Sequence, residues 1–197
     1  MRLLQEGLLL MKFRYFEGPE TEMHGLLEEP AECSFCDRED RCFEIQDSLE
    51  TGCLQCLREG RFGFFHVTEA GYIIEGKLIH SIDDELPETA DPEDGVSPES
   101  VQELWRTPDF PTWNEVEWPV HCRDFMVFLG EWKPADFKQS AGTAAGTTAP
   151  RDLFLAMTDP SCHGLWPEDQ DPEDWWVTCF AFRCPVCGEL AAKVDYS

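Results

Sequence analysis

Basic residues are scarce in this sequence. Lys and Arg together number 15 against 40 Asp and Glu, which gives the 197 residues a formal net charge of −25. A protein that contacts nucleic acid directly needs a basic surface for the phosphates, so the composition argues against direct binding of DNA or RNA. The same excess of acid favours a cationic protein partner. The alternative is that the charge serves only solubility.

Long apolar runs are also missing. No stretch approaches the roughly 20 apolar residues that a membrane-spanning helix needs, so we expect no membrane partner. The opening MRLLQEGLLL does not read as a secretory signal, because Gln5 and Glu6 interrupt it and no small-residue cleavage site follows. We therefore expect a cytoplasmic protein, with residues 1–12 as an N-terminal extension and either Met1 or Met11 as the natural start.

Recognisable catalytic motifs are lacking as well. The five histidines are scattered, with no His-Glu-x-x-His and no His-x-Glu before a cysteine pair. Neither a Ser/His/Asp pattern nor a phosphate-binding loop stands out. We therefore expect that the protein is not an enzyme. A metalloenzyme is the alternative, and it would need an open zinc position or a carboxylate–histidine pair in a cleft.

Cysteine, by contrast, is abundant. Four of the ten cysteines form two pairs, Cys33-x-x-Cys36 and Cys53-x-x-Cys56, with 16 residues between the pairs. A Cys-x-x-Cys turn directs two thiolates to one tetrahedral ion at about 2.3 Å, and a second turn closes the other side. In a reducing compartment such pairs indicate metal rather than disulfides. We predict a structural zinc at these four residues, with a redox centre or unligated thiols as alternatives.

A third pair, Cys184-Pro185-Val186-Cys187, lies between two predicted strands, 175–183 and 190–195. This arrangement is typical of a zinc-ribbon hairpin, and Gly188 suits the left-handed turn after the second ligand. Two ligands do not hold a structural zinc, so two more must come from elsewhere.

Five residues are candidates for these missing ligands: Cys122, His121, Cys162, His163 and Cys179. We favour Cys122, with His121 as the next choice, so that a second zinc is possible in addition to the expected first. The other reading is that the third pair is reduced or weakly metallated. Cys42 and Cys179 are expected to be buried thiols, since free cysteine packs as a small hydrophobe.

The whole pattern predicts an α+β fold with short antiparallel strands and few helices, organised around zinc-knuckle and zinc-ribbon elements. We expect short strands within 62–82, a helix that begins after Ser97, and a buried strand over 124–130. A single domain, 13–197, would contain these parts: a knuckle region 31–60, a core 61–134, a flexible loop 138–150 and a ribbon hairpin 175–197.

The block RTPDFPTWNEVEWPVHCRDFMVFLG, residues 106–130, resembles the CbrC family of small bacterial cysteine-rich proteins. The shared features are Arg106-Thr107-Pro108, Trp113, Trp118, His121-Cys122, Asp124 and Phe128-Leu129-Gly130. The three Cys-x-x-Cys pairs fit the family as well. Asp109 replaces the family glycine, and Leu54-Gln55 stand where family members have Pro-Trp.

This resemblance implies an association with tolerance to nuclease colicins, and hence an immunity-type protein that neutralises a cationic, nuclease-like toxin. A toxin nuclease needs a basic cleft for its substrate, which agrees with the acidic composition. Without a toxin partner, the same features fit a zinc-ribbon adaptor in another interaction or in regulation.

Two acid-rich segments are the candidate partner-binding surface. Their residues are Asp83, Asp84, Glu85, Glu88, Asp91, Glu93 and Asp94 in the first, and Glu168, Asp169, Asp171, Glu173 and Asp174 in the second, together with Trp175. A tryptophan ringed by acids is typical of an interface anchor with a steering rim. The alternative is that the acids are solvated loops and the tryptophans belong to the core.

Overall fold

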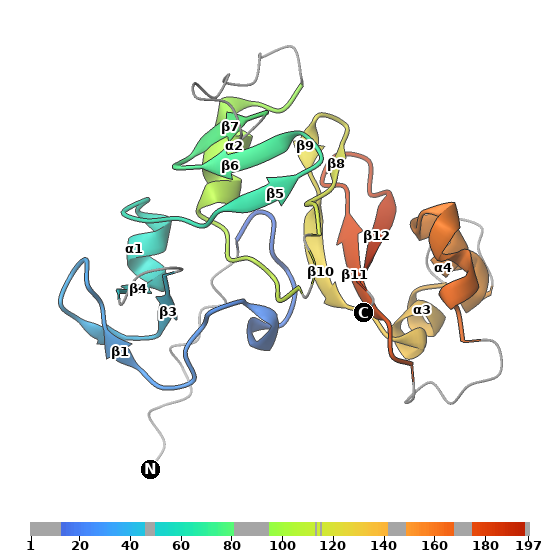
Figure 1. Ribbon diagram of the computed structural model, residues 1–197, viewed down its shortest axis with the longest axis horizontal. Helices are drawn as coiled ribbons and strands as arrows, with labels where there is room; N and C mark the ends of the chain where they lie inside the picture. The colour runs from blue at the N-terminus through green and yellow to red at the C-terminus, as the bar shows by residue number, and fades with distance from the viewer. Residues whose placement is uncertain are drawn as a thin grey trace.

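A three-stranded antiparallel sheet forms the middle of the molecule (Figure 1). The computed structural model describes residues 13–45, 50–80, 95–112, 114, 116–141, 149–167 and 175–195. The strands of this sheet are β10 (Val127–Glu131), β11 (Thr178–Arg183) and β12 (Leu190–Asp195), in that order. The predicted C-terminal hairpin is therefore confirmed, although its first strand begins at Thr178 rather than at residue 175.

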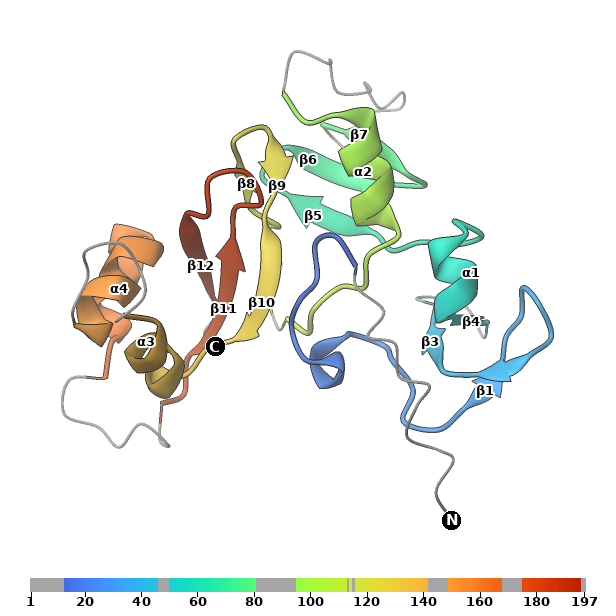
Figure 2. The ribbon, with the colours of Figure 1, turned by 180° about the vertical axis from the view of Figure 1, so that it is seen from behind.

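Each face of this sheet has its own core, because successive side chains of a strand point to opposite faces. From β11, Phe180 and Phe182 enter the larger core, where both rings contact Phe110. Cys179 and Ala181 point the other way, into a smaller core. Two helices cover that second face, α3 (Pro134–Ala141) and α4 (Pro150–Met157), as Figure 2 shows from behind.

A second sheet packs beside the first and carries the predicted helix. Its strands are β5 (His66–Thr68), β6 (Gly71–Ile74) and β7 (Lys77–Ile79), which confirms the short strands expected within 62–82. Helix α2 (Pro98–Trp105) begins after Ser97, whose side chain accepts a hydrogen bond from the Ser100 N–H. The expected N-cap is therefore confirmed.

The N-terminal third is built from very short elements. They are a 3-10 turn η1 (Glu20–Glu22), strands β1 (Ala31–Glu32), β2 (Glu39–Asp40), β3 (Cys42–Glu44) and β4 (Thr51–Cys53), and helix α1 (Leu54–Arg58). β1 pairs with β2 and β3 pairs with β4. Strands of two or three residues and a five-residue helix have little stability of their own, so this region depends on what holds its loops together.

The predicted strand over 124–130 is divided in two. β9 (Asp124–Phe125) pairs with β8 (Val120–His121), whereas β10 pairs with β11. At the break, the Met126 N–H donates to the Pro119 carbonyl. The apolar run is buried except at Leu129, which is partly buried. The chain changes its strand partner within this run, which the sequence of the run cannot reveal.

The expected loop over 138–150 is wrong at its beginning and its end. Residues 138–141 belong to α3, whose Phe137 and Ala141 are buried, and Pro150 is the first residue of α4; residues 142–148 lie outside the described part. Phe137 of α3 packs against Phe154 of α4, and this contact favours the continuation of α3 into the stretch of small residues that begins at Ser140. A 3-10 segment η3 (Pro160–Leu165) follows α4.

The predicted fold class is confirmed: a mixed α+β fold with short antiparallel strands, few helices and cysteine clusters at its turns. Across the described ranges, none of the helices is long and apolar enough to cross a membrane.

Candidate metal centres

The structure brings the first two cysteine pairs together. The Sγ atoms of Cys33, Cys36, Cys53 and Cys56 all lie within 4.8 Å of one another. Cys33 Sγ is 3.7 Å from Cys56 Sγ, and Cys36 Sγ is 3.8 Å from Cys53 Sγ. Four thiolates around one tetrahedral ion at about 2.3 Å stand about 3.8 Å apart. Cluster 1, as we call these four residues, could therefore hold one metal ion.

A tight turn presents the first pair of cluster 1. Between β1 and β2, the Cys33 N–H donates to the Arg38 carbonyl at 2.9 Å, and the Asp37 N–H donates to the Cys33 carbonyl at 2.8 Å. Asp37 has a φ of 55°, a left-handed conformation that Asp tolerates better than most residues. The turn directs both sulfurs to the same side.

The second pair of cluster 1 lies where β4 passes into α1. Cys53 is the N-cap residue of this helix, and Cys56 lies in its first turn. The Cys53 N–H donates to Cys33 Sγ at 3.2 Å, and the Arg61 side chain donates to the Phe35 carbonyl at 2.8 Å. These bonds join the two pairs, so the four sulfurs are positioned by the backbone.

The thiols of cluster 1 differ in their acidity. A hydrogen bond from the Arg38 guanidinium, 3.4 Å from Cys36 Sγ, lowers the pKa of the Cys36 thiol to about 6. Burial raises the pKa of Cys53 and that of Cys56. A buried thiol close to three others ionises when a cation is present to compensate the charge, which is the chemistry of a metal-thiolate site.

A second group of four ligand atoms forms at the other end of the main core. His121, Cys122, Cys184 and Cys187 place one ligand atom each within 4.8 Å of the others. Cys187 Sγ lies 3.4 Å from His121 Nδ1. We call these four residues cluster 2. It is more open than cluster 1, because Cys122 and Cys187 are exposed.

Two hairpins meet to form cluster 2. Cys122 and Arg123 form the two-residue loop between β8 and β9, and their φ angles are 52° and 62°. Two successive positive φ angles make a type I′ turn, which non-glycine residues adopt at a cost of about 1 kcal/mol each. Such strain is typical of functional positions, and here it places the Cys122 thiol opposite the β11–β12 turn.

The pKa values in cluster 2 also diverge. Hydrogen bonding with Cys187 raises the pKa of Cys122 to about 11. Burial, the largest single effect on Cys184, raises its pKa, but hydrogen bonds from the Cys187 backbone and from His121 outweigh it and lower the pKa to about 6. Hydrogen bonding with Cys184 raises the pKa of His121. Cluster 2 therefore contains one thiol that ionises readily and one that does so with a cation present.

A family profile described as "Uncharacterised protein family (UPF0167)" matches residues 10–196. The chain belongs to this family.

Curated relatives support this membership over part of the chain. The "UPF0167 protein Mb2317" of Mycobacterium bovis and the "UPF0167 protein MT2352" of Mycobacterium tuberculosis are each 32% identical over 109 residues. The match takes in 51% of this chain and 53% of each relative, so the chain spans about half the length of the curated relatives it matches. A search of the solved structures found no match.

The structure separates the alternatives for the missing ligands of the C-terminal pair. Cys122 and His121, the first and second choices, both join Cys184 and Cys187. The other three do not: Cys179 is fully buried in the smaller core, His163 Nε2 lies 3.0 Å from the Leu155 carbonyl, and Cys162 contacts the Ser161 hydroxyl. Cys42 is fully buried outside cluster 1, as expected.

The prediction that Trp175 is an exposed anchor of the partner-binding surface is wrong. It is 5% exposed, its ring packs near Phe137, Phe154 and Trp166, and its Nε1–H donates to the Leu165 carbonyl. The neighbouring Trp176 is 58% exposed. The two acidic segments, 83–94 and 168–174, lie outside the described residues.

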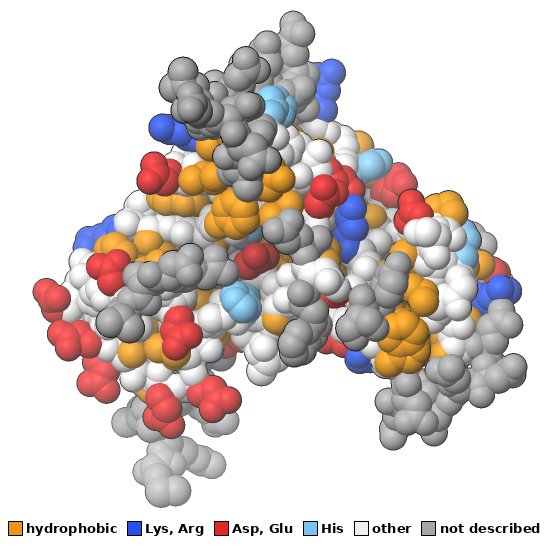
Figure 3. All heavy atoms as spheres, in the orientation of Figure 1, with side chains coloured by type: hydrophobic (Ala, Val, Ile, Leu, Met, Phe, Trp, Pro, Cys, Tyr) orange, Lys and Arg blue, Asp and Glu red, His pale blue; other side chains and the backbone are white. Residues whose placement is uncertain are grey.

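An acidic surface that the sequence did not single out covers the N-terminal region. Its exposed members are Glu28, Glu29, Glu32, Asp37, Glu39, Asp40, Glu44 and Glu50. We call this set the knuckle acids, and Figure 3 shows acidic side chains gathered at the lower left, over β1 to β4. These residues do not form one run in the sequence, since cysteines and other residues separate them. In the sequence, the density of acids around the first two cysteine pairs could have indicated this surface.

A buried polar network supports the hairpin of cluster 2. Asp124 is 7% exposed and accepts hydrogen bonds from Arg14 and Tyr15, both at 2.5 Å, and from Ser100 at 2.8 Å. Burial, followed by the hydrogen bond to Asp124, raises the pKa of Tyr15. Asp124 of β9 pairs with His121 of β8, so this network holds the strand that pairs with the His121 strand.

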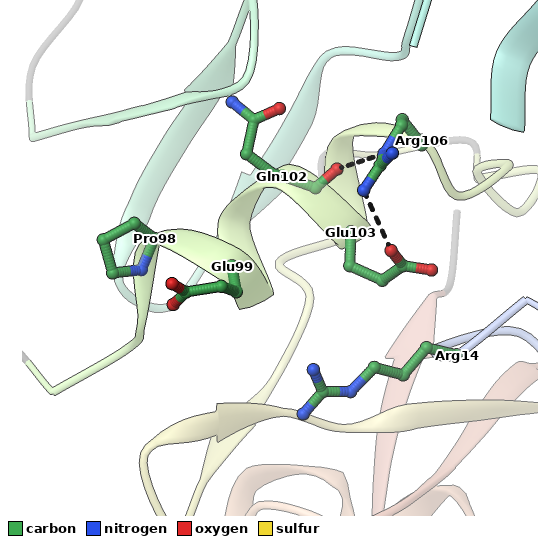
Figure 4. Close-up of a pocket in the computed structure, with 6 residues that line it drawn as sticks. All are labelled: Arg14, Pro98, Glu99, Gln102, Glu103 and Arg106. Carbon is green, nitrogen blue, oxygen red and sulfur yellow. Dashed lines mark hydrogen bonds and ion pairs between the residues drawn. The ribbon is translucent and has the colours of Figure 1, made fainter. Parts of the chain in front are cut away.

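Beside this network is an open hollow of about 350 Å³ (Figure 4). Arg14 and Arg106 line it together with Glu99 and Glu103. Each guanidinium already pairs with a carboxylate, Arg14 with Asp124 and Arg106 with Glu103. The hollow is thus a site of balanced charge.

Proposed function

We propose that clusters 1 and 2 each hold a structural zinc ion. The donor sets, four thiols in one and three thiols with an imidazole in the other, are those that zinc takes in structural sites. The sulfur separations of 3.7 and 3.8 Å in cluster 1 support the tetrahedral geometry. Four protein ligands close the coordination shell, which favours a structural role over catalysis.

Metal analysis tests this proposal directly. Protein purified without added metal should contain about two zinc ions per chain, measured by elemental analysis on protein quantified by amino-acid analysis. A disulfide between any two residues of cluster 1 in the native protein, or a chain that holds no zinc, would contradict it.

We infer further that the zinc-held scaffold presents an acidic surface to a cationic protein, in the manner of an immunity protein that neutralises a nuclease-like toxin in the cytoplasm. The observation that carries this inference is the set of knuckle acids, eight exposed carboxylates on a region of short elements. The net charge of −25 supports it. The resemblance to the CbrC family adds the association with colicin tolerance.

The electrostatic reason is that a nuclease presents a basic cleft to its phosphate substrate. A complementary acidic surface steers association and competes with the substrate for that cleft. Between residues 28 and 45 the basic residues are Arg38 and Arg41, and the Arg61 side chain reaches the Phe35 carbonyl. These three stand against the eight knuckle acids, and Arg41 forms an ion pair with Glu20. The local field is therefore negative.

Association kinetics with a candidate nuclease domain test this function. The nuclease encoded beside this gene, where one is present, is the first choice. Binding should block nucleic-acid cleavage and should weaken as salt rises. Failure to bind or inhibit any basic nuclease domain, while a non-nuclease partner is bound, would favour a zinc-ribbon adaptor instead.

Charge variants locate the surface. Neutralising Glu28, Glu29 and Glu39 to Gln should slow association at low salt and reduce its salt dependence. A matched control neutralises Glu75, Glu99 and Asp152, three exposed acids outside the knuckle region, and should have a smaller effect at equal net charge.

A third variant, with Asp169, Asp171 and Asp174 changed to Asn, tests the second acidic segment. Equal rates in all three variants would show that only the total charge matters.

A further inference from the structure

The two knuckles share one backbone pattern. In the first, the Cys33 N–H donates to the Arg38 carbonyl at 2.9 Å. In the second, the Cys184 N–H donates to the Glu189 carbonyl at 2.8 Å, and the Gly188 N–H donates to the Cys184 carbonyl at 3.0 Å. Asp37 makes the bond that corresponds to Gly188. Arg38 and Glu189 thus occupy the same place, five residues after the first cysteine of each turn.

Side chains of opposite charge fill this shared position, and each reaches its own cluster. Arg38 Nε lies 3.4 Å from Cys36 Sγ. Glu189 Oε2 lies 3.4 Å from His121 Nε2, while the other ring nitrogen, Nδ1, lies 3.4 Å from Cys187 Sγ. The carboxylate is therefore on the outer side of the imidazole and the sulfurs are on the inner side.

The difference in charge matches the difference in ligands. Four thiolates with one divalent ion carry a net charge of −2, whereas three thiolates and a neutral imidazole carry −1. A guanidinium beside Cys36 offsets part of the larger charge. A carboxylate 3.4 Å from Nε2 of His121 does something else: it favours a proton on that nitrogen, which leaves the Nδ1 lone pair directed into cluster 2.

We propose that Arg38 and Glu189 are positioning residues, one for each metal centre. Arg38 stabilises the thiolate charge of cluster 1, and Glu189 holds His121 in the orientation and tautomer that make Nδ1 a ligand of cluster 2. This inference rests on the zinc sites proposed above, and it assigns each site a partner outside its ligand shell.

Zinc affinity of the full-length protein, measured by competition with a chromogenic chelator, tests the assignment site by site. Glu189→Ala should lower the zinc affinity of cluster 2 about tenfold, at the low end of the usual range because the Glu189 side chain is 66% exposed. Glu189→Gln, which keeps an acceptor oxygen, should lose less. Arg38→Ala should lower the affinity of cluster 1 by a similar factor, and each variant should leave the other cluster unchanged.

A spectroscopic readout separates positioning from a merely structural effect. With ¹⁵N-labelled histidine in the zinc-loaded protein, His121 should carry its proton on Nε2. Glu189→Ala should make that proton exchange faster with water, whereas Glu39→Gln, an exposed acid next to Arg38, should change neither the exchange nor either affinity.

The two possible failures are distinct. A wild-type chain without zinc would overturn the zinc proposal and this inference together. If the wild type binds two zinc ions, but Arg38→Ala and Glu189→Ala leave both zinc affinities and the proton exchange of His121 unchanged, only this inference is overturned. A proton on Nδ1 of His121 would overturn the role of Glu189 specifically.

Discussion

Removing one ligand of cluster 1 should unfold the N-terminal region and leave the central sheet intact. Cys53 is the informative position, because its register partner across β3–β4 is Cys42, a second fully buried cysteine that lies outside the cluster. Cys53→Ala and Cys42→Ala therefore delete the same atom from neighbouring places, and only the first removes a metal ligand.

The magnitudes follow from what each thiol contacts. Cys42 Sγ donates to the Ala31 carbonyl at 3.3 Å, so Cys42→Ala loses a weak hydrogen bond and a small buried group, together about 1–2 kcal/mol. Cys53→Ala loses a similar amount of packing and also a ligand. Structural zinc contributes about 10–16 kcal/mol in zinc-finger peptides, or about 2.5–4 kcal/mol for each of four ligands.

The total for Cys53→Ala, about 3.5–6 kcal/mol, is comparable to the lower part of the roughly 5–15 kcal/mol that stabilises a whole domain. The elements near the cluster cannot compensate, since β1 to β4 have two or three residues each and α1 has five. We therefore expect local unfolding over 31–60, and retention of β10, β11 and β12, whose strands are longer and packed on both faces.

Amide hydrogen exchange with mass spectrometry, combined with zinc analysis, is the measurement. Cys53→Ala should lose one zinc ion and the exchange protection of 31–60, while Cys42→Ala should keep both ions and most of the protection. If Cys53→Ala kept two zinc ions and wild-type protection, cluster 1 would not be a structural metal centre.

Three further predictions follow from the same contacts. Cluster 2 should release zinc before cluster 1 when a chelator is titrated in, because Cys122 and Cys187 are exposed; Cys122→Ala should abolish the first step of release and leave the second. In zinc-loaded protein Cys42 should resist alkylation at neutral pH, because it is fully buried and its pKa is about 11; removal of zinc with a chelator, which should unfold 31–60, should expose it to the reagent, as peptide mapping would show. Asp124→Asn should lower the free energy of unfolding by about 2–3 kcal/mol in urea, because it weakens a carboxylate that accepts bonds from Arg14, Tyr15 and Ser100; Tyr15→Phe, which removes one of these bonds, should cost about 1 kcal/mol.

Local features were predictable from the sequence because local rules produce them. The β11–β12 hairpin follows from apolar strand residues on both sides of a Cys-x-x-Cys-Gly turn, and the start of α2 follows from Ser97 and Pro98. The spacing of the first two cysteine pairs indicated cluster 1 for the same reason: a short turn determines where two neighbouring thiols point. The burial of Cys42 and Cys179 agreed with the general behaviour of free cysteine.

Longer-range features were not predictable in this way. The strand expected over 124–130 changes partner at Met126: β9 before it pairs with β8, and β10 after it pairs with β11. Trp175, expected at the surface because acids surround it in sequence, is buried because α3 and α4 bring other aromatic rings to it. A sequence window shows which residues are neighbours in the chain, and these outcomes depend on neighbours in space.

Cluster 2 shows which part of the site the sequence determines and which part depends on the tertiary structure. The sequence by itself determined that Cys184 and Cys187 form a knuckle lacking two ligands, and it placed His121 and Cys122 first among five candidates. Only the tertiary structure decided among them, because the choice depends on two hairpins meeting across more than sixty residues of chain. The meeting is fixed by packing: Phe182 of β11 and Trp118, which precedes β8, pack against each other in the main core, and the turns that follow them are thereby brought together.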